Sequence, residues 1–270
     1  LVAVFSGNNG LWASNEKNLS RTYSATSTDN GKSWGKVTDI TDQVYNGVYG
    51  EGTRYGLFTG SGSGIQLKHG AHAGRLMLVV AARNDATWGG TMSNYAIYSD
   101  DGGITWKASK NAACTNGDEA KVVELSNGNI LMSIRNRAKE HRLFSLSTDG
   151  GETWSEPKLN TTILDPACNG DIIAYTYKGK NLLLHSLPAS KTTRENVTVY
   201  VSEDNGETWI PKRCIYKGYS AYSSLQVLDD GTIGIIVEEG KWDGNLPGED
   251  GFNLGYYRFN LAWLMEGDQE

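Results

Sequence analysis

One eight-residue pattern, Ser-x-Asp-x-Gly-x-x-Trp, occurs four times in this chain and constrains its fold more than any other feature. The copies occupy residues 27–34, 99–106, 147–154 and 202–209. Their serines are 72, 48 and 55 residues apart, which suits structural repeats of roughly 40–50 residues with insertions. A repeat of this size cannot bury its own apolar face, so the copies must belong to units that stack against one another.

Each copy, called a box below, follows a strand-like run and has the chemistry of a hairpin turn. The aspartate accepts hydrogen bonds from turn amides, the glycine can take a positive φ, and the tryptophan buries a large ring. A calcium loop would need a longer spaced run of oxygen ligands, so a structural role is favoured. The pattern predicts four buried rings (Trp34, Trp106, Trp154, Trp209) and four turn-bonded carboxylates (Asp29, Asp101, Asp149, Asp204).

The rest of the chain also favours many short strands. The 270 residues include 33 Gly and 14 Tyr but only 5 Pro, and no linker or long helical pattern interrupts them. We therefore expect one domain over residues 1–270. The Gly-rich residues 60–67 lack the Lys-Ser/Thr ending of a phosphate loop and are interpreted as a tight turn into a strand. Residues 254–261 are predicted to form a closing strand.

Charge and composition exclude several classes of function. The net charge is −6 with both signs scattered, so no basic stripe is present for nucleic acid. The sequence contains no run of 18 apolar residues, so no membrane span is predicted. The first residues do not resemble a secretory signal. The three cysteines lack C-x-x-C spacing, which argues against a disulfide framework and a zinc site. We expect no metal and no cofactor.

The four boxes, together with Gly62-Ser-Gly64-Ile-Gln-Leu67, resemble the sialidase family over essentially the whole chain. The resemblance implies an all-β fold, a six-bladed β-propeller with the boxes at its blade turns. It also implies an exo-α-sialidase, a glycoside hydrolase that releases terminal sialic acid from glycoconjugates. Its partners would be sialylated glycans, and its location would be secreted, periplasmic or at the cell surface.

The expected substrate has a carboxylate on its anomeric carbon, and guanidinium groups bind carboxylates bidentately. Sialidases use three arginines for this purpose. Arg135, at the end of the strand-like residues 128–135, matches the second of them. Arg194, just ahead of the fourth box, matches the third. These two side chains are the predicted carboxylate clamp.

The same carboxylate should repel an anionic nucleophile, which favours a neutral phenol activated by a base. The matching tyrosine is Tyr222, within Gly218-Tyr-Ser-Ala-Tyr222-Ser-Ser-Leu225. A phenol with an ordinary pKa near 10 is almost wholly protonated at neutral pH, so a base must lie within hydrogen-bond reach. By the resemblance that base is Glu119.

Two further glutamates complete the predicted site. Glu238 matches the carboxylate that orients the first arginine of the family, although the neighbouring Glu239 is an alternative because Val237 replaces the usual tyrosine before it. Glu51 matches a glutamate that contacts the sugar's amide or hydroxyls.

Two parts of the family's site have no match in this chain. They are the first arginine and the general-acid aspartate, and Arg21, Asp39 and Asp42 lie in no motif that resembles either. We expect both residues upstream of Leu1, in an N-terminal remainder of the same propeller whose first blade is incomplete here. That remainder is expected to span about one blade of roughly 40–50 residues and part of another.

Other functions fit parts of the sequence. A non-catalytic glycan-binding propeller would keep the boxes and lack the Glu-Arg-Arg-Tyr set. A protein-binding propeller of the WD type would have G-H and W-D signatures, which are absent. Hydrolysis, transfer of sialic acid to another sugar and intramolecular release of an anhydro product share one core, and the sequence leaves these open.

Overall fold

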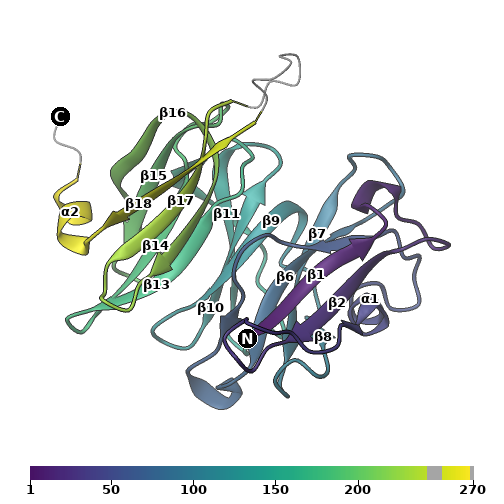
Figure 1. Cartoon of the computed structure of the whole chain (residues 1–270). Helices are drawn as coiled ribbons and strands as arrows, with labels where there is room; N and C mark the ends of the chain where they lie inside the picture. Colours follow the sequence, from purple (N-terminus) through teal and green to yellow (C-terminus); the bar gives the residue numbers. More distant parts are fainter. Residues whose placement is uncertain (242–250, 268–270) are drawn as a thin grey trace. The chain divides into compact units, whose positions relative to one another are not determined.

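The computed structural model describes residues 1–241 and 251–267, and they form two compact units. Unit 1 contains residues 1–134 and 145–157, and unit 2 contains residues 135–144 and the chain from 158 onward. The chain leaves unit 1 within strand β10 (Ile130–Asn136) and returns to it within β11 (Glu140–Ser147). Figure 1 labels the main helices and strands of both units.

Unit 1 is built from antiparallel strands in two sheets. One sheet has the order β1-β2-β3, and in the other β4, β6, β7 and β9 follow in that order. The short β5 (Ile65–Gln66) pairs with β6, and β8 (Lys107–Ala108) pairs with β7. The remaining bounds are β1 Val2–Asn8, β2 Ser20–Thr26, β3 Thr38–Asp39, β4 Leu57–Thr59, β6 Leu76–Arg83, β7 Met92–Ser99 and β9 Cys114–Glu124.

A helix that the sequence pattern did not predict, α1 (Thr41–Tyr49), covers part of unit 1. Its side chains Val44 and Tyr45 are fully buried in a cluster with Leu57 and Trp106. The Tyr45 hydroxyl donates to the Ser20 carbonyl, which satisfies the buried phenol. Because only one face of this short helix is apolar, tertiary packing explains its stability better than its own propensity does.

Unit 2 is dominated by a six-stranded antiparallel sheet of order β13-β14-β15-β16-β17-β18. Strand β12 (Lys158–Asp165) pairs with β11, and helix α2 (Leu261–Glu266) follows β18. The other bounds are β13 Asp171–Tyr177, β14 Lys180–Pro188, β15 Glu195–Ser202, β16 Ile210–Val227, β17 Ile233–Glu239 and β18 Asn253–Phe259. Buried aliphatic side chains of β14, β15, β16 and β17 form its core.

Strand β16 is long because it serves two groups of strands. Its first part pairs with β15 from Ile210 to Tyr219, and its second part pairs with β17 from Ser220 onward. Gly218, with φ +112°, lies where the partner changes. A strand that ends one antiparallel group and begins the next is the connection that consecutive blades require.

The predicted strands are confirmed, with one boundary correction. The runs before all four boxes lie in β2, β7, β11 and β15, and residues 130–136 form β10. The predicted closing strand over 254–261 ends earlier, at Phe259, because helix α2 begins at Leu261. The Asn260 side chain caps the N-terminus of that helix. Among the described residues, no helix is long and apolar enough to cross a membrane.

The four boxes have the predicted hydrogen bonds. In each copy the serine hydroxyl donates to the aspartate and accepts the glycine N–H, at 2.8–2.9 Å for both bonds. Each aspartate also accepts the N–H of the residue four positions on at 2.9 Å. Hydroxyl groups of Ser33 and Thr105 are the main cause that lowers the pKa of Asp29 and Asp101 to about 2. The predicted role of the aspartates is confirmed.

The tryptophan prediction is right for three boxes and wrong for one. Trp106, Trp154 and Trp209 are 3%, 6% and 4% exposed, but Trp34 is 47% exposed. Trp106 is covered by α1, and Trp209 stacks on Phe144 with 5.8 Å between ring centroids. Trp34 follows β2 in the three-stranded sheet and belongs to neither buried cluster. The pattern determines the turn, whereas burial of the ring depends on a separate element that covers it.

Candidate active site

Tyr222, the predicted nucleophile, lies in the second part of β16 with two arginines beside it, all within unit 2. Arg135 Nη1 donates to the Tyr222 hydroxyl at 3.2 Å. The Arg194 guanidinium carbon lies 5.7 Å from the centre of the Tyr222 ring. Residues 135, 194 and 222 are distant in sequence, and all three side chains are half-buried. The fold of unit 2 therefore brings the predicted clamp and the predicted nucleophile together.

Each of the two arginines is presented at a strand terminus. Arg135 is the next-to-last residue of β10, and Arg194 directly precedes β15. Arg194 Nη2 donates to the Ala167 carbonyl at 3.1 Å, which fixes one edge of its guanidinium. The remaining donors of such a planar fork can bind an anion bidentately.

Glu238 and Glu239 have different partners, so the structure separates the two candidates. Glu238 accepts the Tyr222 backbone N–H at 3.1 Å. Glu239 accepts the Tyr257 hydroxyl, and this bond is the main cause that raises the pKa of Tyr257 to about 12. Consecutive residues of a strand point to opposite faces, which explains the difference. The geometry favours Glu238 as the carboxylate on the Tyr222 side.

The backbone at Tyr222 is irregular, which frees its N–H for Glu238. The register between β16 and β17 shifts between Ser220 and Ser223, so Tyr222 lies in a bulge-like segment. Such irregularities locally interrupt a ladder and change the direction of a side chain, and they are frequent beside active sites.

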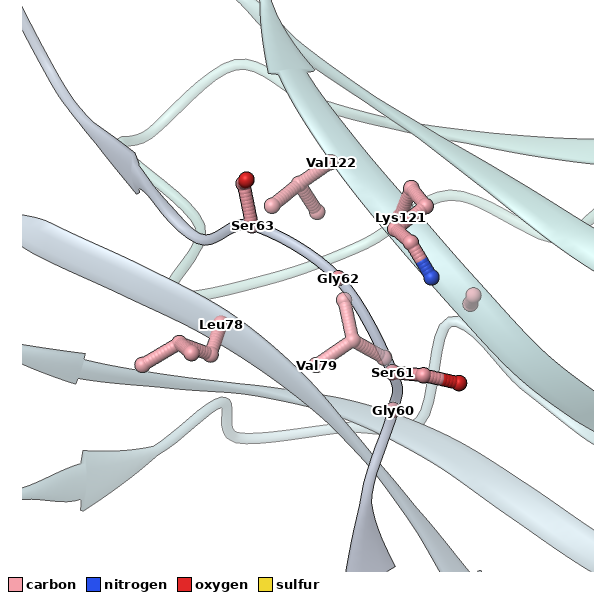
Figure 2. Close-up of a pocket in the computed structure, with 9 residues that line it drawn as sticks. Gly60, Ser61, Gly62, Ser63, Leu78, Val79, Lys121 and Val122 are labelled. Atoms are coloured by element: carbon pink, nitrogen blue, oxygen red, sulfur yellow. The ribbon is translucent and has the colours of Figure 1, made fainter. Parts of the chain in front are cut away.

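Glu119, the predicted base, belongs to unit 1 and lies on β9. Its side chain is 6% exposed and accepts a hydrogen bond from the Ser61 hydroxyl at 3.3 Å. Lys121, two residues on and therefore on the same face of the strand, is also buried. Figure 2 shows Lys121 beside Ser61 and Gly62 around a cavity of about 10 Å³, room for about one water. The role of Glu119 as the base stays a prediction.

Gly62 explains part of the Gly-rich segment beside Glu119. Its φ is +109°, and a Cβ there would lie 2.5 Å from Lys121 Cε. The segment links β4 to β5, in agreement with the interpretation as a tight turn rather than a phosphate loop.

Glu51 is exposed in the turn that follows α1, on a different element from Ser61 and Glu119. Its contact with the sugar stays a prediction. None of the three cysteines, all of which lie among the described residues, forms a disulfide; Cys114 and Cys168 are buried and Cys214 is half-buried. In the part of the chain that the structure describes, no group of three or more His, Cys, Asp or Glu side chains is arranged to hold a metal ion.

Sequence reasoning did not single out Ser61, beside Glu119 in unit 1, or the pair Arg142 and Asp165 in unit 2. Ser61 was assigned to a turn and not to Glu119, although a hydroxyl between two glycines was a weak signal. Arg142 and Asp165 form a buried ion pair in unit 2 whose Asp165 carboxylate accepts the N–H of Asn136, the neighbour of Arg135. No spacing rule pairs two residues so far apart on neighbouring strands.

Comparison with known proteins identifies the family to which this chain belongs. A model of the BNR repeat-like domain family matches residues 1–235. A sialidase from Micromonospora viridifaciens is 37% identical over 248 residues, which is 89% of this chain and 35% of that protein. The solved Hadza microbial sialidase Hz136 superposes with a TM-score of 0.77 at 25% identity, over 97% of this chain and 50% of that chain.

A third match is the intramolecular trans-sialidase from Ruminococcus gnavus, solved in complex with oseltamivir carboxylate. It has a TM-score of 0.72 at 27% identity and covers 92% of this chain and 52% of that chain. This chain belongs to the BNR repeat-like domain family, and within it to the sialidase catalytic domains of the β-propeller type. It spans about a third to a half of the length of the relatives named here.

Proposed function

We propose that this chain supplies most of the active site of an exo-sialidase that releases sialic acid from sialylated glycans. The observation that carries the proposal is the contact of Arg135 with the Tyr222 hydroxyl at 3.2 Å, with Arg194 over the same ring. Two cations around one phenol suit a substrate that has a carboxylate on the reacting carbon. Location outside the cytoplasm stays a prediction.

In this proposal Arg135 and Arg194 bind the sialic acid carboxylate through charge-assisted hydrogen bonds. The Tyr222 oxygen attacks the anomeric carbon and loses its proton to a base, the role that the resemblance to sialidases gives to Glu119. The bond to the glycan oxygen breaks, and that oxygen takes up a proton from a general acid. Water then releases sialic acid from the tyrosyl intermediate with retention of configuration. Glu238 supports the backbone at Tyr222 and, by the resemblance to sialidases, would orient the first arginine of the family.

The test is Tyr222→Phe in the whole protein, because this change removes only the reacting oxygen. Turnover of 3′-sialyllactose should fall by about 10³-fold or more, while the Kd for free sialic acid should change by less than about 3-fold. Tyr257→Phe is the matched control, since it also removes one hydroxyl from a strand of the same sheet in unit 2. Wild-type turnover in Tyr222→Phe would disprove the nucleophile assignment.

The same assay decides between the enzyme and a non-catalytic glycan-binding propeller. A binding module would bind sialyllactose and release no sialic acid at any enzyme concentration. Release that Glu119→Gln reduces by on the order of 10²–10⁴-fold, the usual contribution of a general base, would support catalysis.

Intramolecular transfer is a second candidate, favoured by the 27% identity to the Ruminococcus gnavus intramolecular trans-sialidase. Hydrolysis and transfer within the sugar give products that differ by one water. Mass spectrometry of the product in water and in heavy-oxygen water separates them, because only hydrolysis incorporates solvent oxygen. An anhydro product that contains no heavy oxygen would show that the reaction is intramolecular transfer and not hydrolysis.

A further inference from the structure

Unit 2 contains a fully buried ion pair that none of the roles above uses. Arg142, on β11, and Asp165, at the end of β12, have side chains that are 0% exposed, and Arg142 Nη1 lies 3.0 Å from Asp165 Oδ2. Burying two charges costs desolvation free energy, and the attraction between them often does no more than offset that cost. A gain in stability is therefore a weak explanation for such a pair. The other hydrogen bonds of the pair indicate what it does.

The Asp165 carboxylate connects two segments of backbone. Oδ2 also accepts the N–H of Asn136 at 3.0 Å, directly after Arg135 in the chain. Oδ1 accepts the N–H of Cys168 at 2.9 Å, and Arg142 Nη1 donates to the Cys168 carbonyl at 2.8 Å. The ion pair therefore holds the end of β10 and the turn that follows β12 at the same time.

That turn is the one that contacts Arg194. The Ala167 carbonyl accepts Arg194 Nη2 at 3.1 Å. Ala167 has φ +59°, a left-handed conformation that is unfavourable for an alanine. Such a conformation persists only where the surroundings impose it. The bonds from Asp165 and Arg142 to Cys168, the next residue, impose it here.

We propose that Arg142 and Asp165 are positioning residues that set the distance and orientation of Arg135 and Arg194 as one clamp. This inference rests on the proposed function. Asp165 holds the backbone beside Arg135, and through the strained turn it places the acceptor that orients Arg194. A bidentate clamp tolerates little displacement, since an error of about 1 Å can cost on the order of 10²-fold in rate.

A second buried arginine offers a matched control. Arg75 in unit 1 is 3% exposed and pairs with Asp100 at 2.7 Å. It also donates to the Gly150 carbonyl at 2.8 Å, so it joins two box turns. Arg75 is itself buried and pairs with an aspartate as Arg142 does, although Asp100 is 46% exposed. Its contacts lie among the boxes rather than beside Arg135 and the Ala167 turn.

The experiment compares Asp165→Asn and Arg142→Lys with Asp100→Asn and Arg75→Lys in the whole protein. Each variant is assayed below its own melting transition, with the active fraction titrated. In the first two the KM for 3′-sialyllactose and the Kd for sialic acid should rise on the order of 10- to 100-fold. In the other two both constants should stay within about 2-fold. The Kd for the methyl ester of sialic acid, which lacks the carboxylate charge, should not change in any variant.

A double variant adds a readout that lost stability alone would not change. If Asp165 acts partly through Arg194, then Asp165→Asn should weaken binding by a smaller factor when Arg194→Lys is already present, because only its effect through Arg135 remains. Additive losses, or equal losses for the ester and the acid, would overturn the positioning role. If Asp165→Asn fails to fold, Arg142→Lys, which keeps the charge, gives the same comparison.

A crystal structure of the variant makes the inference independent of activity. In Asp165→Asn or Arg142→Lys the Ala167 turn should relax, and the bond from Arg194 to the Ala167 carbonyl should be lost. A wild-type protein that neither binds nor releases sialic acid would refute the proposed function, while this structural result would still decide whether the pair positions the arginines. An unchanged Arg194 would overturn the inference.

Discussion

The two ends of β15 in unit 2 are built in different ways. At one end the box is held by bonds between residues two to four apart, such as Ser202 to Asp204 and Asp204 to Thr208. At the other end the bonds connect residues far apart, 27 for Arg194 to Ala167 and 87 for Arg135 to Tyr222. A box turn can form from its own segment, whereas the site exists only when the whole unit is folded.

The two ends also differ in backbone strain. In the box, the positions with positive φ are Asn205 and Gly206, two residue types that adopt this conformation readily. At the other end they include Lys139, Glu140 and Ala167, with φ of 66°, 71° and 59°. Asn196, at the same end, is again a residue type that adopts positive φ readily. We expect from the difference that the box end mainly stabilises the fold and that the other end accepts strain to hold the predicted site residues.

The largest effect should come from a ring at a box end. Trp209→Ala should lower the free energy of unfolding by about 3–5 kcal/mol, because the ring is buried against Phe144. Trp34→Ala should cost less than about 1 kcal/mol, because Trp34 is half-exposed. Urea unfolding followed by circular dichroism measures both. Equal losses would mean that Trp34 is covered in the protein in solution and that the boxes are equivalent.

Arg194→Lys tests the opposite end and should separate binding from stability. A lysine keeps the charge but loses the planar fork, so the Kd for sialic acid should rise about 10- to 100-fold, or about 1.4–2.8 kcal/mol. The free energy of unfolding should change by less than about 0.5 kcal/mol, because the side chain is only half-buried. Calorimetric titration and urea unfolding of the same samples give the two values. A loss of stability as large as the loss of binding would contradict the division between the ends.

Ala167→Gly should act in opposite directions on stability and binding. Glycine relieves the left-handed strain but adds freedom to the unfolded chain, so the net gain in stability should be below about 1 kcal/mol. The same freedom should loosen the carbonyl that holds Arg194 and weaken sialic acid binding by a few-fold. Thermal unfolding and the Kd together measure this trade-off. A variant that binds more tightly would show that the strain has no positioning role.

The contrast between the ends explains how far sequence reasoning went. Ser202, Asp204 and Trp209 stand at fixed short spacings, so the turn and its bonds were predicted from the pattern alone. Arg135 and Tyr222 were found only through resemblance to a family, because nothing local relates them. Helix α1 was missed because its apolar face is short. The exposure of Trp34 was missed because burial of a box tryptophan depends on a separate element that packs over the ring. The Arg142–Asp165 pair was missed for the same reason, since it joins two strands across a bulge.

The smallest effect should be an acid-dependent loss of stability at the boxes. Asp101 has its pKa lowered from 3.8 to about 2, mainly by the Thr105 hydroxyl. A carboxyl whose pKa is lower in the folded than in the unfolded state stabilises the fold above the unfolded value. That contribution should be complete above about pH 4 and should disappear as the pH falls through about 2. Asp101→Asn removes the titrating group and keeps the shape.

The melting temperature of wild type should therefore exceed that of Asp101→Asn at pH 5, and the difference should shrink steadily toward pH 2. Asp29, whose pKa is also lowered to about 2, should give the same profile in Asp29→Asn. Because Asp101 is exposed and Asp29 half-buried, and both are bonded within their own turns, the difference should depend on pH and little on bound sialic acid. A constant difference from pH 5 to pH 2 would mean that the shape of the turn, rather than the charge of its aspartate, stabilises the box.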